Sequence, residues 1–262
     1  MSSKSVKLTT FKRPLIIAHR GYRAKYPENT LVSFRASLDA GVQMIELDVM
    51  LSKDRKVVVI HDATLERTTN GYGSVSCYTI KELKALDAGS WFQPRFAGEQ
   101  IPTLEEVLDD VSGRTMINIE IKASAFEARH PVDSIESQVV ELVARRNLQA
   151  SVLISSFEWK ILDHIVTMKD APGIALLSRH PADGDNVERC VRLKAFSWHP
   201  NCGALQHEQV KKMHEAGICV FPYNVDSQKE YQRMIQMDVD GVITSDPVTV
   251  PRLGSVIRTE EC

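Results

Sequence analysis

The sequence predicts an α/β fold in which eight parallel strands, each followed by a helix, close into a (β/α)8 TIM barrel. Three observations support this prediction: the length of 262 residues, the alternation of short apolar runs with segments of helical period, and a strand count that reduces to eight. Such alternation is typical of a parallel sheet covered by helices, and barrels of this class commonly contain about 250 residues. We therefore expect one domain over residues 1–262.

Short apolar runs, most of them rich in Ile and Val, are expected to form the strands. They are Leu15–Ala18, Met44–Met50, Val57–Ile60, Met116–Ile121, Val152–Ser155, Gly173–Leu177, Ala195–Trp198, Cys219–Val225 and Gly241–Thr244. The second and third runs are joined only by the polar residues 52–56. Because this connection is too short for a crossover helix, we interpret the two runs as one long strand that folds back on itself. Eight barrel strands then remain.

The segments between these runs have helical length and period. Thr30–Ala40 places Leu31, Phe34 and Leu38 on one face and is followed by Gly41, a common helix stop. Similar patterns occupy residues 133–146, 206–216 and 227–237, and residues 103–106 have the pattern of a capping box that opens a further helix. Most of the predicted strands are therefore followed by a segment able to cover them.

Residues 63–100 interrupt the alternation. This segment follows a predicted strand end, contains a helix-like stretch at Thr79–Leu86, and includes the aromatic residues Trp91, Phe92 and Phe96. It is much longer than an ordinary connection in a compact domain. We therefore expect a small inserted cap after the second strand, at the mouth of the barrel.

The composition excludes several classes of protein. A net charge of −2 provides no global field to attract nucleic acid or an anionic membrane. The five cysteines are scattered without a C-x-x-C pair, which argues against a disulfide framework or a zinc knot. The first apolar run, Leu15–Ala18, is shorter than the roughly 7–15 residues of a secretory signal or the about 20 of a membrane span. We expect a cytoplasmic protein with a small-molecule substrate and no stable membrane association.

Three acidic residues interrupt predicted strands. Glu46 and Asp48 are two positions apart and share one strand face, and Glu120 lies in the similarly apolar run Met116–Ile121. A solvated strand face is the simpler interpretation, but the apolar neighbours of these residues indicate burial on both faces. Because unpaired buried carboxylates are costly, we expect the three to converge on one divalent cation. Oxygen ligands favour Mg²⁺ or Ca²⁺ over zinc, and no H-x-H pair indicates an imidazole-rich zinc site.

Two histidines and two basic residues follow the predicted strands. His19 and His61 each come directly after an apolar run, where barrel active sites are built. Phosphodiester cleavage needs a base and an acid, and histidine serves as either near neutral pH. Arg20 and Lys122 are available to bind phosphoryl oxygens, although a surface salt bridge is the ordinary role of either residue alone. The combination favours metal-assisted phosphodiester chemistry.

Taken in order, these motifs resemble the glycerophosphodiester phosphodiesterase family. The resemblance is found in His19-Arg20-Gly21, Pro27-Glu28-Asn29-Thr30, Glu46-Leu47-Asp48, His61-Asp62, residues 118–122 and residues 241–247. It extends from about Leu15 to Asp246, and residues 65–73 and 87–91 resemble the inserted cap of the family's bacterial cytoplasmic members.

The resemblance implies an activity and a role for each site residue. It implies hydrolysis of glycerophosphodiesters, the deacylated phospholipids, to glycerol 3-phosphate and an alcohol. The substrate's own 2-hydroxyl would attack phosphorus, and water would then open the cyclic phosphate. The implied roles are general acid and base for His19 and His61, phosphate binding for Arg20 and Lys122, and binding of one cation, Mg²⁺ slightly ahead of Ca²⁺, for Glu46, Asp48 and Glu120.

The chain departs from the family pattern at Tyr223-Asn224-Val225-Asp226, where the family often has Trp-Thr-Val-Asn. Tyr223 is expected to line the glycerol pocket with an aromatic face. Two alternatives stay open at this point. One is a lysophospholipase D that uses the cap aromatics for acyl chains. The other is a non-catalytic barrel that binds glycerophosphate, although such a protein is expected to lack at least one of the seven site residues.

Overall fold

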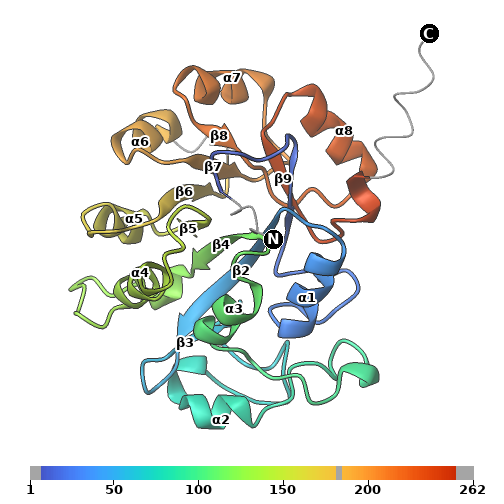
Figure 1. Ribbon diagram of the computed structural model, residues 1–262, viewed down its shortest axis with the longest axis vertical. Coiled ribbons are helices and arrows are strands. Elements are labelled where there is room, and N and C mark those ends of the chain that lie inside the picture. The colour runs from blue at the N-terminus through green and yellow to red at the C-terminus, as the bar shows by residue number, and fades with distance from the viewer. Residues whose placement is uncertain (1–6, 181–184, 252–262) are drawn as a thin grey trace, which may run out of the picture.

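The computed structural model describes residues 7–180 and 185–251 of the chain. Its strands are β1 (Leu15–Ala18), β2 (Met44–Leu51), β3 (Val57–Val59), β4 (Met116–Ile121), β5 (Val152–Ser156), β6 (Gly173–Ser178), β7 (Ser197–Pro200), β8 (Cys219–Val220) and β9 (Gly241–Thr244). Its α-helices are α1 (Leu31–Asp39), α2 (Ile80–Lys84), α3 (Leu104–Val111), α4 (Ile135–Arg145), α5 (Trp159–Ile165), α6 (Asn186–Arg192), α7 (His207–Glu215) and α8 (Gln228–Gln236). Figure 1 shows the strands at the centre with the helices around them.

The strands form a nearly closed parallel barrel. Their order is β8-β7-β6-β5-β4-β2-β1-β9, and every neighbouring pair in this path is parallel. Backbone hydrogen bonds complete the ring, because Asp240 N donates to Val220 O at 3.1 Å and Ile243 N donates to Pro222 O at 2.9 Å. The predicted barrel is therefore confirmed.

The predicted fold-back of the second strand is also confirmed. β3 pairs antiparallel with β2, with Met50 opposite Val58, and lies outside the barrel path. Two predicted strands have different bounds in the structure. β7 begins at Ser197 rather than Ala195, because the amide of Ala195 donates to Cys190 O and completes the end of α6. Beyond Val220 the predicted strand loses its regular ladder near Pro222, which has no amide hydrogen to donate.

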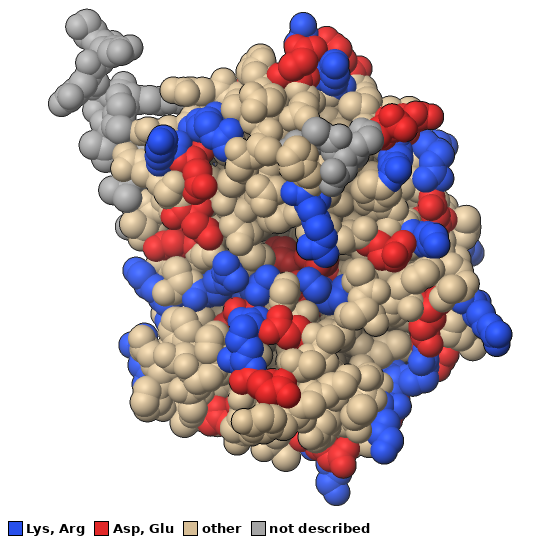
Figure 2. Space-filling model, turned by 180° about the vertical axis from the view of Figure 1, so that it is seen from behind, with Lys and Arg blue, Asp and Glu red and all other residues tan. Residues whose placement is uncertain are grey.

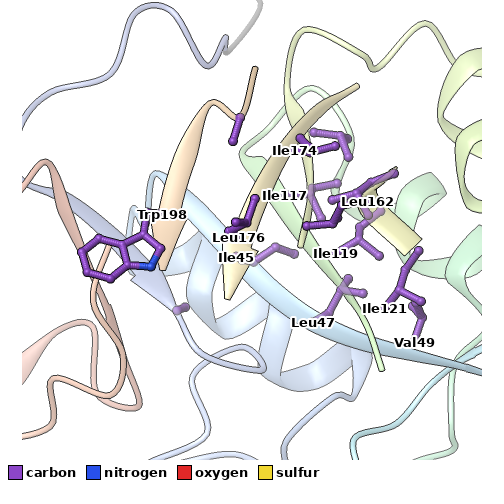
Figure 3. Close-up of a cluster of buried hydrophobic side chains, with 14 of the residues drawn as sticks. Ile45, Leu47, Val49, Ile117, Ile119, Ile121, Leu162, Ile174, Leu176 and Trp198 are labelled. Atoms are coloured by element: carbon purple, nitrogen blue, oxygen red, sulfur yellow. The ribbon is translucent and has the colours of Figure 1, made fainter. Parts of the chain in front are cut away.

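Alternate residues of each strand face the helices and the barrel interior. Ile45, Leu47 and Val49 of β2 lie beside Ile117, Ile119 and Ile121 of β4 in the core between the strands and the helices (Figure 3). The residues between them point the other way. This alternation turns Glu46, Asp48 and Glu120 into the barrel without interrupting the apolar core.

A second apolar cluster closes the barrel beneath those polar residues. It combines strand residues from the interior of the barrel with Leu8 and Phe11 from the segment before β1. The strand residues are Leu15, Ile17, Met44, Met116, Leu153 and Ile243, and Phe221 joins them from the position directly after β8. The polar layer therefore rests on an apolar floor.

The inserted segment after β3 has a small core of its own. Leu65, Val75, Leu83 and Ala88 pack there against Met50 and Val58 of the β2–β3 hairpin, together with Ile60 and Ile101. In Figure 1 this segment, with α2, lies at one side of the barrel next to β3 and α3. In the two described ranges, 7–180 and 185–251, no helix is long and apolar enough to cross a membrane.

Candidate active site at the mouth of the barrel

A cavity of about 540 Å³ opens where the barrel strands end. Its lining residues lie within the barrel strands or in the segments that follow the strands: His19, Arg20, Glu46, His61, Asn118, Glu120, Lys122, Ala123, Ser124, Phe157, Leu177, Arg179, Asn201, Tyr223, Asn224 and Ile243. Figure 2 shows a hollow near the middle of one face, with acidic side chains inside it and basic side chains around it. Seven of the eight predicted site residues line this cavity, and the eighth, Asp48, is buried beneath it.

The turn after β1 is shaped by its glycine. Arg20 adopts a left-handed backbone conformation with φ 56°, and Gly21 follows with φ 78°. A Cβ atom on Gly21 would lie 2.3 Å from the hydroxyl oxygen of Ser33 in α1, so only glycine allows the turn to approach this helix. The turn directs the amide of Arg20 to Glu46 Oε2 at 2.8 Å.

The three acidic residues meet in the barrel interior. In the register of β2 and β4, Asp48 is opposite Glu120 and Glu46 is opposite Asn118. All three carboxylates are buried, and one oxygen from each lies within 4.8 Å of the others. The sequence predicted this convergence.

Both basic side chains predicted to bind phosphate form ion pairs with carboxylates. Arg20 Nη1 donates to Glu28 Oε1 at 2.8 Å, and its Nε lies 3.2 Å from Asp48 Oδ2. Lys122 Nζ donates to Glu120 Oε1 at 2.6 Å and lies 3.3 Å from Asp48 Oδ1. These two side chains therefore neutralise only part of the acidic cluster.

The pKa shifts of the three carboxyl groups reflect the negative charge that Arg20 and Lys122 leave uncompensated. Burial and the neighbouring carboxylates raise the pKa of Glu46 well above its ordinary value, and the same causes raise the pKa of Glu120 to about 7. The pKa of Asp48 is lowered despite its burial, because Lys122 and Arg20 lie beside it. Glu46 Oε1 is also buried and has no hydrogen-bond partner among residues 7–180 and 185–251. A bound cation would satisfy this oxygen and replace the protons that Glu46 and Glu120 would otherwise retain.

The two predicted histidines differ in their surroundings. His19 is buried, its Nε2 lies 4.0 Å from Glu46 Oε2, and burial lowers its pKa well below the ordinary value. His61 is partly exposed, and burial also lowers its pKa. His61 Nδ1 lies 2.5 Å from Asp62 Oδ1, a contact that leaves the Nε2 atom of His61 as its proton-exchanging atom. Both imidazoles are therefore favoured in the neutral form, with one ring nitrogen free of a proton.

A network not predicted from the sequence supports His61. Arg67, from the inserted segment, contacts Asp62 through Nε and Glu28 through Nη2, the latter at 2.7 Å. Glu28 in turn accepts from Arg20, so one chain of ion pairs links His61 to the acidic cluster. The Pro27–Thr30 motif marked this region, but no sequence pattern paired Glu28 with Arg67, which are 39 positions apart.

The far wall of the cavity is aromatic. The ring of Tyr223 meets that of Phe157 edge-on at 5.8 Å, and the Tyr223 hydroxyl donates to Ser178 O at 3.0 Å. Arg179 places its guanidinium 4.6 Å from the ring centre of Phe157 and also lines the cavity. The sequence reasoning missed Arg179. Its position directly after β6, Gly173–Ser178, was the available signal.

The cap aromatics expected near a lipid substrate do not line this cavity. The ring of Phe92 contacts those of Trp91 and Phe96, with ring centres 5.7 and 5.8 Å apart. The ring of Phe96 also contacts that of Tyr26, at 5.6 Å between centres. Among the described residues, none of the cavity lining comes from residues 63–100.

Comparisons with known proteins agree with this geometry. Residues 19–249 match the model of the glycerophosphoryl diester phosphodiesterase family. A glycerophosphodiester phosphodiesterase from Caldanaerobacter subterraneus subsp. tengcongensis is 39% identical over 242 residues, covering 92% of this chain and 98% of that protein. One from Bacillus altitudinis is 37% identical over 88% of this chain and 94% of its own. The solved structure of an Oleispira antarctica phosphodiesterase in complex with the product sn-glycerol-3-phosphate has a TM-score of 0.82 and 28% identity, covering 92% of this chain and 96% of that one.

Proposed function

Because this chain belongs to the glycerophosphoryl diester phosphodiesterase family, we propose that its barrel cavity cleaves glycerophosphodiesters with His19 and His61 as the acid–base pair. The protein is a glycerophosphodiester phosphodiesterase, and the product of the reaction is glycerol 3-phosphate. The Oleispira relative was solved with that product, which supports a cavity of this shape as the binding site.

The observation that carries the proposal is the buried set of Glu46, Asp48 and Glu120 beside two imidazoles. We assign this set to one divalent cation, Mg²⁺ slightly ahead of Ca²⁺, because all three donors are carboxylate oxygens and one of these oxygens has no other partner. Such a cation supplies a positive charge that polarises the phosphoryl group.

The side chains around the cluster divide the remaining tasks. Arg20 and Lys122 border the cavity and provide positive charge for the phosphoryl oxygens, and Tyr223 presents its ring to the glycerol. One histidine takes the proton of the attacking hydroxyl and the other returns a proton to the departing alcohol. Holding the substrate's 2-hydroxyl beside phosphorus makes the attack intramolecular, which favours it over capture of free water. A 2-deoxy substrate that turned over rapidly would contradict this nucleophile.

Deacylated substrates are favoured over lysolipids. The aromatic side chains of the insertion pack against one another and Tyr26 rather than along the cavity, so they do not supply an acyl channel there. The non-catalytic alternative is also disfavoured, because each of the seven acid–base, metal and phosphate-binding residues is present and gathered at one place.

Metal removal tests the proposal. Metal-stripped enzyme should release no glycerol 3-phosphate from glycerophosphocholine, glycerophosphoethanolamine or glycerophosphoglycerol, and adding Mg²⁺ or Ca²⁺ alone should restore release. Glu46→Gln should reduce turnover by orders of magnitude while the circular dichroism spectrum and melting temperature stay near those of the parent. The matched control is Glu141→Gln on the exposed face of α4, which should be fully active. Full activity in excess chelator would disprove the metal assignment.

A further inference from the structure

A second cluster of side chains with potential metal-ligand atoms lies on the outer wall of the barrel. His130 precedes α4 in the loop after β4, Glu136 is in the first turn of α4, and His164 is in the last turn of α5. Figure 1 shows α4 and α5 as neighbours. One potential ligand atom from each of the three residues lies within 4.8 Å of the others. None of the three lines the catalytic cavity.

The contacts converge on a single buried carboxylate. Nδ1 of His130 lies 2.7 Å from Glu136 Oε1, and Nδ1 of His164 lies 2.9 Å from the same oxygen. The two imidazole rings are 4.1 Å apart between centres. Glu136 is fully buried, whereas each histidine side chain is 27% exposed.

The second oxygen of Glu136 has no partner. Oε2 is buried and makes no hydrogen bond within the described part of the chain. Both histidine contacts are made to Oε1, so neither reaches this second oxygen. A buried carboxylate with an unsatisfied oxygen is costly unless a cation or a further donor compensates it.

We propose that His130, Glu136 and His164 form a zinc site that is separate from the catalytic cation site. Two imidazole nitrogens with one carboxylate oxygen match the donor preference of Zn²⁺, whereas the all-carboxylate catalytic cluster matches Mg²⁺ or Ca²⁺. Three protein ligands leave a fourth position for water, which can enter because both histidines are partly exposed.

Metal binding requires only a small rearrangement. Both Nδ1 atoms now donate to the carboxylate, so each proton must move to Nε2 before its Nδ1 lone pair can bind the metal. Zinc–ligand bonds of about 2.0–2.1 Å at tetrahedral angles place ligand atoms about 3.3 Å apart. The two nitrogen–oxygen contacts at 2.7 and 2.9 Å would therefore open by roughly half an ångström.

The site would connect three segments of the outer wall. His130 has a left-handed backbone conformation with φ 44°, which a non-glycine residue adopts only when its surroundings impose it. A metal on its side chain would fix this residue to α4 and α5. The loop that contains His130 begins next to Lys122, so the proposed site anchors the far end of a loop whose near end borders the catalytic cavity.

Metal titration of the intact protein tests the proposal. Metal-stripped enzyme and its Glu46→Gln variant, which weakens the catalytic site, should each bind Zn²⁺ at the outer site in calorimetry. Co²⁺ should replace it with the visible absorption of a site that contains imidazole. His164→Ala and His130→Ala should weaken Zn²⁺ binding by more than the roughly 10–100-fold that loss of an outer-sphere partner costs. The matched control is His207→Ala, an exposed histidine of α7, which should bind Zn²⁺ like the parent.

Nuclear magnetic resonance of the unmutated protein gives a second readout if a histidine variant fails to fold. Zn²⁺ should shift the Nδ1 resonances of His130 and His164 and leave that of His207 in place. Unchanged imidazole resonances at saturating Zn²⁺, or equal affinity in His164→Ala and the parent, would overturn the proposal and leave a purely hydrogen-bonded cluster.

Discussion

Adjacent residues of β2 occupy opposite environments, and this alternation creates the acidic cluster of the candidate site. Leu47 packs in the apolar core under the helices, while Glu46 and Asp48 on either side of it face the barrel interior. Because side chains alternate with a period of two, a shift of one position would place a leucine in the site and both acids in the core. The local pattern therefore determines the chemistry as well as the packing.

The two histidines should contribute mainly to the transition state. His19→Ala and His61→Ala should each lower kcat by about 10²–10⁴-fold, with much smaller changes in KM, because acid–base groups act chiefly as the proton moves. The double variant should lose much less than the product of the single losses, since both residues serve one sequence of proton transfers. Steady-state kinetics on glycerophosphocholine measure this. Near-normal kcat in either single variant would show that the histidine has another role.

At the scale of elements, Arg67 links the inserted segment to His61. Arg67 contacts Asp62, which lies against Nδ1 of His61, while the apolar side chains of the insertion pack on the β2–β3 hairpin and on Tyr26. Its contribution to catalysis should therefore be the orientation of His61.

Removing that side chain should disturb catalysis without unfolding the insertion. Arg67→Ala should lower kcat on the order of 10²-fold, the loss expected from displacement of a catalytic group by about 1 Å. The control is Arg95→Ala in the same segment, whose guanidinium lies over Phe96 and contacts no site residue among those described. Kinetics and thermal melts of both variants check this. Equal kcat values would show that Asp62 orients His61 without help.

The elements differ in how far the sequence predicts them. Met116–Ile121 and Gly241–Thr244 have the predicted bounds, because apolar runs are recognisable locally. The carboxylate cluster was also predictable, since buried acids in apolar strands need a shared partner. The Glu28–Arg67 pair and the His130–His164 pair were not, because they join elements whose approach depends on the assembled barrel.

For the whole molecule, a buried histidine in the barrel makes stability depend on pH. His199 is fully buried, its Nε2 contacts Ser197 Oγ at 2.9 Å, and burial lowers its pKa to about 3 from 6.5. Below about pH 6.5 the unfolded chain binds a proton that the folded protein cannot hold, so the free energy of unfolding falls as the pH falls. The contribution is fully present above that pH and is lost toward about pH 3.

This dependence can be isolated by substitution. The parent should lose up to about 1.4 kcal/mol of unfolding free energy per pH unit through this residue, and His199→Gln should lose correspondingly less. Urea unfolding at several values between about pH 6.5 and pH 5 measures the slopes. The control is His207→Gln on the surface of α7. Parallel slopes for the parent and His199→Gln would contradict the assigned protonation state.

The apolar floor of the barrel also has a consequence for how molecules enter and leave the cavity. Leu8, Phe11 and the strand residues around them close the barrel under the polar layer, so molecules reach phosphorus from the side where the strands end. The departing alcohol and the incoming water would then share the cavity mouth. If the proposed cyclic phosphate forms, an alcohol that lingers there could recombine with it before water arrives. Under that mechanism, we expect commitment to glycerol 3-phosphate to depend on how quickly the alcohol leaves, so that a bulky or tightly held alcohol slows the cycle even when its bond to phosphorus breaks easily.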